Sequence, residues 1–212
     1  MSILFLFAAL SAGLASGFLP SGAPCGLWPK ATLATAVAVA VGFAIQQGNP
    51  ALLPLLSRDP AILDRGEVWR IITALFVQDG GMAGFLFNLF WLLAIGVVAE
   101  RRWGENRWLL VYLGGGIISV LLALVWQPVG AGNSIACLAL AGGLTAYVTS
   151  RKLFILQIVV RMIGLSAGAM LVMTGDVHGL AFWVGVPFGL AFAKRDTLSA
   201  TPQEQTVVGP AV

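Results

Sequence analysis

Three polar residues lie inside otherwise apolar stretches of this sequence. Asn88 lies in GFLFNLFWLL, Ser134 in GAGNSIACLALAGG and His178 in GDVHGLAFWVGVPFG. A polar side chain is costly in such surroundings, which favours a functional role over chance. A serine there could serve hydrolysis, and it would need a water-filled cavity because water is the second substrate.

Each of the three residues also has an ordinary structural explanation. A serine in a membrane helix is most often bonded to its own backbone. A histidine there is more often a hydrogen-bonded packing residue, and an asparagine near a helix start commonly bonds a neighbouring helix. None of them alone identifies an enzyme, so the hypothesis of a catalytic site depends on the positions of all three residues together.

The composition predicts an all-α membrane protein. Of 212 residues, 58% are hydrophobic and only 10% are charged, whereas soluble domains have about 25% charged residues. The apolar residues form long blocks, and about 17–25 such residues cross a hydrocarbon core as a helix. The net charge is +3, and the basic residues are scattered between the apolar blocks. This distribution does not indicate a nucleic-acid-binding surface. A single histidine and two distant cysteines predict no metal site, and no cofactor motif is present.

The blocks divide the chain into three parts. Residues 1–30 form an N-terminal hydrophobic helix and turn, and this helix is either a secretory signal or, as we expect, a retained extra transmembrane helix. Residues 31–195 form a six-helix membrane domain, and residues 196–212 a disordered cytoplasmic tail. The six blocks of the domain are 31–47, 82–99, 107–126, 134–149, 153–173 and 175–193.

Basic residues predict the orientation of the helices. The positively charged gaps lie on one side if the helices alternate, and that side is cytoplasmic. These gaps contain Lys30, Arg101, Arg102, Arg107, Arg151, Lys152, Lys194 and Arg195. The gap 48–81 is then external, the C-terminus is cytoplasmic, and Asn88, Ser134 and His178 all fall in the outer half of the membrane. The block at 134–149 spans only about 24 Å, so Ser134 is expected below the external surface.

Four sequence segments, in this order, resemble the rhomboid family of intramembrane serine proteases. The first is GEVWRIITALFVQDG at 66–80, and the second is FNLFW at 87–91 followed by AERRWG at 99–104. The third is GNSI at 132–135, in the place of a G-x-S-G motif. In the fourth, His178 is followed by small residues at Ala181 and Gly185, which resembles H-x-x-G-x-x-x-G. The resemblance covers about residues 31–193.

The resemblance implies a six-helix rhomboid-like bundle with one extra N-terminal helix, and a Ser–His dyad. Ser134 would be the nucleophile, His178 its general base, and Asn88 an oxyanion donor together with backbone N–H groups near Ser134. The substrates would be transmembrane proteins cut near the outer membrane boundary, in a bacterial inner membrane, with no cofactor. Small residues would let the last helix pack closely on the Ser134 helix; these are Ala181, Gly185, Gly189, Gly142 and Gly143.

Three positions differ from the family pattern and keep a second hypothesis open. Gly84 stands where the family often has a histidine, Ile135 where it has a glycine, and Leu138 where an aromatic residue stacks on the base. A catalytically inactive rhomboid-like protein, binding membrane partners or serving as a subunit of a complex, is the alternative. Arg161 is expected either to reach the inner surface or to pair with a partner protein or lipid headgroup. The resemblance implies that no acid is needed to complete a triad; Asp176 is the nearest candidate for one and is expected to start a helix.

Overall fold

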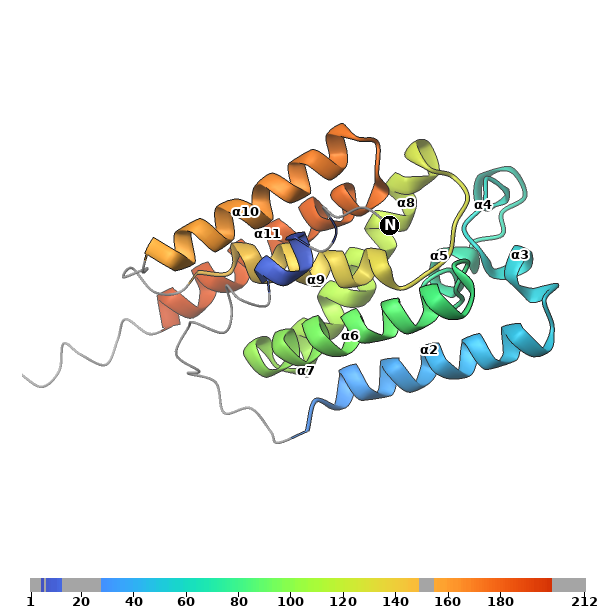
Figure 1. The fold of residues 1–212 in the computed structure, drawn as a ribbon, viewed down its shortest axis with the longest axis horizontal. Coiled ribbons are helices and arrows are strands. Elements are labelled where there is room, and N and C mark those ends of the chain that lie inside the picture. The colour runs from blue at the N-terminus through green and yellow to red at the C-terminus, as the bar shows by residue number, and fades with distance from the viewer. Residues whose placement is uncertain (1–4, 6, 13–27, 149–154, 200–212) are drawn as a thin grey trace, which may run out of the picture.

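The computed structural model describes residues 5, 7–12, 28–148 and 155–199, which form a bundle of helices (Figure 1). The elements are α2 (Lys30–Gly48), α3 (Leu52–Leu56), α4 (Ala61–Asp64), α5 (Arg70–Thr73), α6 (Gly81–Trp103), α7 (Glu105–Leu109), the π-helical segment η1 (Leu110–Gly115), α8 (Gly116–Trp126), α9 (Ser134–Ala146), α10 (Ile155–Met173) and α11 (Val177–Ser199). Within this part of the chain there is no strand, and the prediction of an all-α membrane protein is confirmed.

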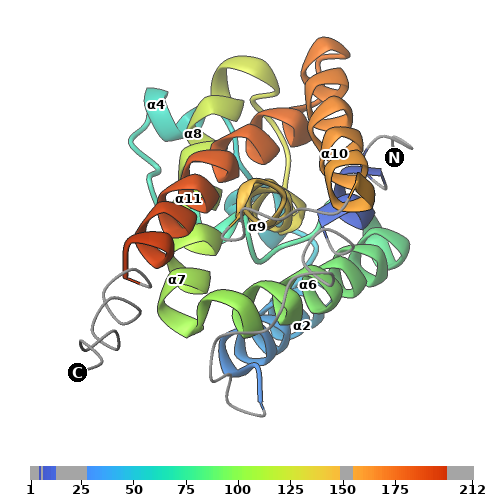
Figure 2. The same ribbon diagram turned by 90° about the vertical axis from the view of Figure 1, so that its left-hand side faces the viewer.

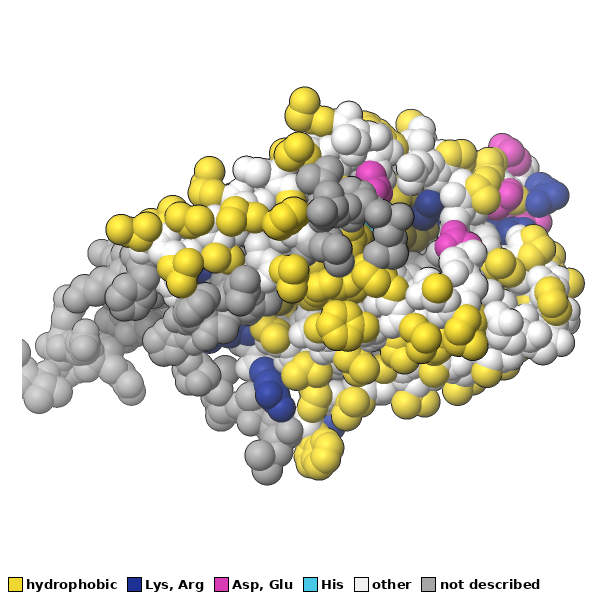
Figure 3. Space-filling model, in the orientation of Figure 1, with side chains coloured by type: hydrophobic (Ala, Val, Ile, Leu, Met, Phe, Trp, Pro, Cys, Tyr) yellow, Lys and Arg dark blue, Asp and Glu magenta, His cyan; other side chains and the backbone are white. Residues whose placement is uncertain are grey.

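Five of the helices described are long and apolar enough to cross a membrane. They are α2, α6, the continuous stretch Glu105–Trp126, α10 and α11. Hydrophobic side chains cover the face made by α10, α6 and α2, whereas charged side chains gather at the end that carries α4 (Figure 3). An apolar girdle with charges at its ends is the surface that a lipid bilayer requires.

The short helix α9 is the centre of the bundle. Helices α6, α8, α10 and α11 surround it in the end-on view (Figure 2), and every residue from Ile135 to Thr145 is buried. Its 13 residues rise only about 20 Å, so α9 is shorter than the hydrocarbon core of about 30 Å. It ends at Ala146, earlier than the predicted block, because Tyr147 is extended.

The backbones of α9 and α11 touch through small residues. A methyl group added at Gly142 would collide with the carbonyl of Phe182, and one at Gly185 with the carbonyl of Ala139. Gly189 lies in the same way against Gly143, and Ala181 is fully buried. Small residues let helix backbones approach closely enough to bring short side chains on the two helices together.

Two buried charged side chains bind helix ends. Arg161 of α10 is buried and donates to carbonyls at the C-terminal end of α9, those of Leu144, Thr145 and Tyr147. Neither expectation for Arg161 named this contact, which is favourable because the last carbonyls of a helix lack intrahelical donors and attract a cation. The second charged side chain is Glu100, which binds the N-terminus of α2. Its carboxylate accepts hydrogen bonds from the N–H groups of Ala31 and Thr32 at 2.9 and 2.7 Å.

At both ends of the described chain, helical residues extend beyond the predicted six-helix domain. Helix α11 runs to Ser199, so residues 196–199, which were expected in the disordered tail, form its last turn. Asp196 ties that turn to the bundle, because its carboxylate accepts hydrogen bonds from Arg107 at 2.8 and 2.7 Å and from the Tyr147 hydroxyl at 2.7 Å. Residues 7–12 are helical and lie between α6 and α10 (Figures 1 and 2), while most of the predicted N-terminal segment 1–30 and residues 200–212 lie outside the described residues.

Replacing Gly185 by alanine is expected to destabilise the bundle, because the new methyl group would meet the Ala139 carbonyl. Overpacking of this kind costs about 1–3 kcal/mol or more when backbone has to move. Thermal unfolding of the purified protein in detergent measures the loss. Gly84→Ala is the matched control, since a methyl group there meets nothing within 4 Å; equal unfolding temperatures for the two variants would contradict the close contact.

Candidate active site

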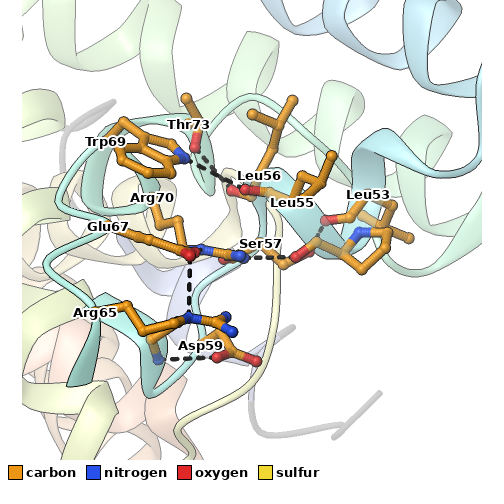
Figure 4. Close-up of polar contacts among 12 residues, drawn as sticks. Leu53, Leu55, Leu56, Ser57, Asp59, Arg65, Glu67, Trp69, Arg70 and Thr73 are labelled. Carbon is orange, nitrogen blue, oxygen red and sulfur yellow. Dashed lines mark hydrogen bonds and ion pairs between the residues drawn. The ribbon is translucent and has the colours of Figure 1, made fainter. Parts of the chain in front are cut away.

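The loop between α2 and α6, which we name the external loop after its predicted side of the membrane, is held in place by the segment around Arg70 (Figure 4). The buried Arg70 guanidinium donates to the Glu67 carboxylate at 2.5 Å and to the carbonyls of Pro54 at 2.5 Å and Ser57 at 3.0 Å. The Thr73 hydroxyl donates to the Leu56 carbonyl at 2.8 Å. These bonds fold the loop onto itself, and the loop then continues into the residues that line the site.

The irregular segment before α9 is held by partners from this external loop. Arg58 and Gly130 exchange backbone hydrogen bonds of 2.9 and 3.1 Å, and the Arg58 side chain donates to the Gln127 carbonyl at 3.1 Å. The Ala131 N–H donates to the Asp79 carboxylate at 2.8 Å. Burial lowers the pKa of Arg58, and the nearby charge of Asp79 partly opposes that shift. The hydrogen-bonding groups of this irregular backbone are therefore satisfied by protein, as they would have to be within lipid.

The hydroxyl of Ser134 and the ring of His178 are in hydrogen-bond contact. Ser134 is the first residue of α9 and His178 the second of α11, and Oγ lies 2.9 Å from Nε2 although the residues are 44 positions apart. This separation is within the range that a nucleophile and its base need. The backbone contact between α9 and α11 accounts for it, because it lets two short side chains meet.

A carboxylate holds the other side of the same imidazole. One oxygen of Asp176, Oδ1, lies 2.6 Å from Nδ1 of His178 and also accepts the His178 backbone N–H at 3.0 Å. Burial raises the pKa of Asp176, but the hydrogen bonds and charge of His178 outweigh burial, so the pKa is lowered overall. Asp176 was expected to start a helix, which it does, and the ring contact is an addition.

The Ser134 hydroxyl faces a cavity of about 240 Å³. Among the residues that line it are Asn88, Gly132, Asp176, His178, Gly84 and Phe5. Gly132 has a φ of 141°, which favours glycine, and a methyl group there would lie 3.2 Å from Nδ2 of Asn88 and 3.6 Å from Oγ of Ser134. A glycine at position 132 thus keeps open the space between the amide donor and the hydroxyl.

A network of side-chain amides fixes Asn88. Its Nδ2 donates to Oε1 of Gln78 at 2.7 Å, and Nε2 of Gln78 donates to Oδ1 of Asn133 at 3.0 Å. Gln78 also exchanges bonds of 2.6 and 2.9 Å with Gln46 of α2 through its own backbone. An amide nitrogen carries two hydrogens, so Asn88 can bond Gln78 with one and point the other into the cavity. Sequence reasoning missed Gln78, whose place in an external gap gave no signal of burial.

An aromatic ring packs on His178, and it comes from the N-terminal segment. The ring centroids of Phe5 and His178 are 5.3 Å apart in an edge arrangement, and Phe5 also contacts Phe87 at 5.3 Å. Leu138, the position where an aromatic residue was looked for, is fully buried in the core instead. Gly84, the position of the absent family histidine, borders the cavity with no atom within 4 Å of an added methyl group.

Comparison with known proteins agrees with this architecture. A family model described as Rhomboid domain matches residues 65–196. The chain is 30% identical over 155 residues to Rhomboid protease GluP of Bacillus subtilis, covering 66% of this chain and 30% of that protein. RHOMBOID-like protein 5 of Arabidopsis thaliana is 25% identical over 158 residues, 69% of this chain and 51% of the relative. Rhomboid-like protease 3 of Toxoplasma gondii is 31% identical over 85 residues, 39% and 32% of the two chains. The chain thus spans about a third to a half of the length of these relatives.

Replacing Gln78 by alanine is expected to destabilise the protein, because the side-chain amides of Asn88 and Asn133 lose their partner. Each buried polar group left unsatisfied costs about 1–3 kcal/mol. Thermal unfolding in detergent checks this, with Gln127→Ala as the control, since the Gln127 side chain makes an exposed 3.2 Å bond to Gly175. A Gln78 variant as stable as the control would show that the amide network does not contribute.

Proposed function

The chain belongs to the rhomboid family, an integral membrane family with protease members, and from that premise we propose that it is an intramembrane serine endopeptidase. The observation that carries the proposal is the 2.9 Å separation between Oγ of Ser134 and Nε2 of His178. The cavity of about 240 Å³ beside them offers room for water within an otherwise apolar bundle.

Acylation would begin at the Ser134 hydroxyl. As Oγ bonds to the carbonyl carbon of the scissile peptide, Nε2 of His178 takes the hydroxyl proton, and the carbonyl oxygen becomes an oxyanion. The C–N bond then breaks, and His178 gives the proton to the departing amine. Water attacks the resulting ester in the second half, with His178 again taking and returning a proton, which releases the acid and the free serine.

The oxyanion would be stabilised by donors on two elements. Nδ2 of Asn88 faces the space beside Gly132, and the first N–H groups of α9 have no acceptor within their own helix. The positive end of the α9 dipole adds to this effect. Donors that are fixed before the reaction do not have to reorganise as charge develops, and the Gln78 contact at 2.7 Å fixes Asn88 in this way.

The substrates would be transmembrane proteins cut near the outer membrane boundary. Because α9 has only 13 residues, we expect Ser134 to lie below the external surface. We place the protein in a bacterial inner membrane with its C-terminus on the cytoplasmic side, on the basis of the basic residues between the helices. No cofactor and no nucleic acid enter the proposed reaction.

A catalytically inactive rhomboid-like protein is the second candidate, binding membrane partners or serving as a subunit of a membrane complex. The open space at Gly84 favours it, because an oxyanion donor is absent from a position where the family often has one. Ile135 in place of a glycine points in the same direction. In this alternative, binding of partners would be unaffected by removing the Ser134 hydroxyl.

A fluorophosphonate probe is expected to label the wild-type protein at Ser134. The Ser134 oxygen bonds to phosphorus, fluoride leaves, and the hydroxyl proton passes to His178. Ser134→Ala should abolish labelling, and His178→Ala should slow it at least about 100-fold. Fluorescence of the labelled band on a gel gives the rate, with Ser119→Ala as a control, because the Ser119 hydroxyl is fully buried on the Gly115 carbonyl at 2.7 Å. Folded wild-type protein that stays unlabelled would favour the inactive candidate.

Gly84→His is expected to raise the labelling rate about tenfold, because it adds an oxyanion donor at the cavity wall. The Cβ atom of the new side chain fits without a clash, since nothing lies within 4 Å of a methyl group added at this position. Gly84→Leu, of comparable size but without a donor, separates hydrogen bonding from filling of space. A Gly84→His rate no higher than that of Gly84→Leu would mean that this position cannot supply the oxyanion contact.

A further inference from the structure

We infer that Asp176 is a positioning residue for His178, so that the site works as a Ser–His–Asp array rather than the Ser–His pair that the family pattern implies. The inference rests on the proposed function, because it assigns the residue that prepares the base of that reaction. It goes beyond that function by naming a third side chain.

The contact between Asp176 and the imidazole is direct and lies opposite the serine. Oδ1 is 2.6 Å from Nδ1, while Nε2 is 2.9 Å from the Ser134 hydroxyl. A carboxylate accepts but does not donate, so it selects the tautomer in which Nδ1 carries the hydrogen. That tautomer leaves the lone pair of Nε2 free to take the serine proton, which is the arrangement a general base needs.

The backbone around Asp176 is fixed, which makes the carboxylate a rigid support. Its N–H donates to the Leu171 carbonyl at 2.9 Å, and its carbonyl accepts the Gly179 N–H at 3.0 Å. Gly175 makes the preceding turn with a φ of 77°. The Asp176 oxygen is therefore held at the start of the helix that carries His178, and ring and carboxylate move as one unit.

The carboxylate also provides charge at the moment when His178 becomes an imidazolium. The pKa of Asp176 is lowered, so its side chain is ionised near neutral pH. The other charged residues lining the cavity, among those that the structure describes, are Arg58 and Asp79. Asp79 is bonded to the Ala131 N–H and Arg58 to the Gln127 carbonyl, which leaves Asp176 as the charge in contact with the ring.

Helix capping alone does not explain both contacts of the Asp176 carboxylate. The bond from the His178 N–H to Oδ1, 3.0 Å long, is an ordinary N-cap contact, and a serine at position 176 could make it. A serine is too short to reach Nδ1 as well. The variant Asp176→Ser therefore keeps the capping oxygen and removes the ring contact, while Asp176→Asn keeps the size and removes the charge.

His178 is the only histidine in the chain, so nitrogen NMR of histidine-labelled protein reports on this ring alone. The full chain, purified in detergent with a histidine-free affinity tag, is measured from about pH 5 to pH 9. The wild type is expected to carry its hydrogen on Nδ1. In both variants the share of the Nδ1–H tautomer should fall, because the carboxylate, which can only accept that hydrogen, is gone.

The fluorophosphonate labelling rate gives the second measurement on the same samples. Asp176→Ser and Asp176→Asn should lower the maximum rate about 10- to 100-fold. The control is Asp59→Asn, since Asp59 accepts the Ala61 N–H at 2.9 Å on the external loop. Thermal unfolding should show Asp176→Ser within the range of that control.

The two proposals fail in different ways. A wild-type protein that shows an Nδ1–H tautomer dependent on Asp176 but is never labelled would overturn the protease proposal and keep the positioning role of Asp176. A labelled wild type whose ring tautomer and labelling rate are unchanged in both variants would overturn the Asp176 inference and keep the protease. A hydrogen on Nε2 in the wild type would also overturn it.

Discussion

The backbone contact between α9 and α11 is the constraint on which the site depends. Neither Ser134 nor His178 has a side chain long enough to bridge two helices at ordinary spacing. Gly142 and Gly185 remove the side chains that would hold the helices apart, and the hydroxyl and imidazole then meet at 2.9 Å. Because lipid gives helices no hydrophobic reason to associate, this packing has to come from shape, which small residues provide.

A second requirement is that polar groups around the site be satisfied in a low-dielectric interior. The external loop supplies most of the partners: Arg58 and Asp79 bind the irregular segment before α9, and Gln78 fixes Asn88. Arg161 meets the same need at the opposite end of α9. The two ends of α9 are thus held by side chains from other parts of the chain, and the loop that fixes one end also completes the cavity.

The sequence predicted the helices and the three central residues because apolar blocks and polar exceptions within them are visible in one dimension. Asn88, Ser134 and His178 were found as such exceptions. Gln78, the ring contact of Asp176 and the Phe5 ring were not, because each depends on which segments meet in space or on which way a short side chain turns. The contacts of Arg161, expected at the inner surface or on a partner protein or lipid headgroup, were not predicted because the carbonyls that it binds belong to another helix. The end of α11 was set too early because the hydrogen bonds of Asp196 come from other helices.

The most direct test of the central claim is a double-mutant cycle on cleavage of a quenched transmembrane peptide in liposomes. If Ser134 and His178 act as one unit, the double alanine variant should be no slower than Ser134→Ala alone, because removing one partner already removes the contribution of the other. Losses that multiply in the double variant, or a wild type no faster than protein-free liposomes, would contradict the account.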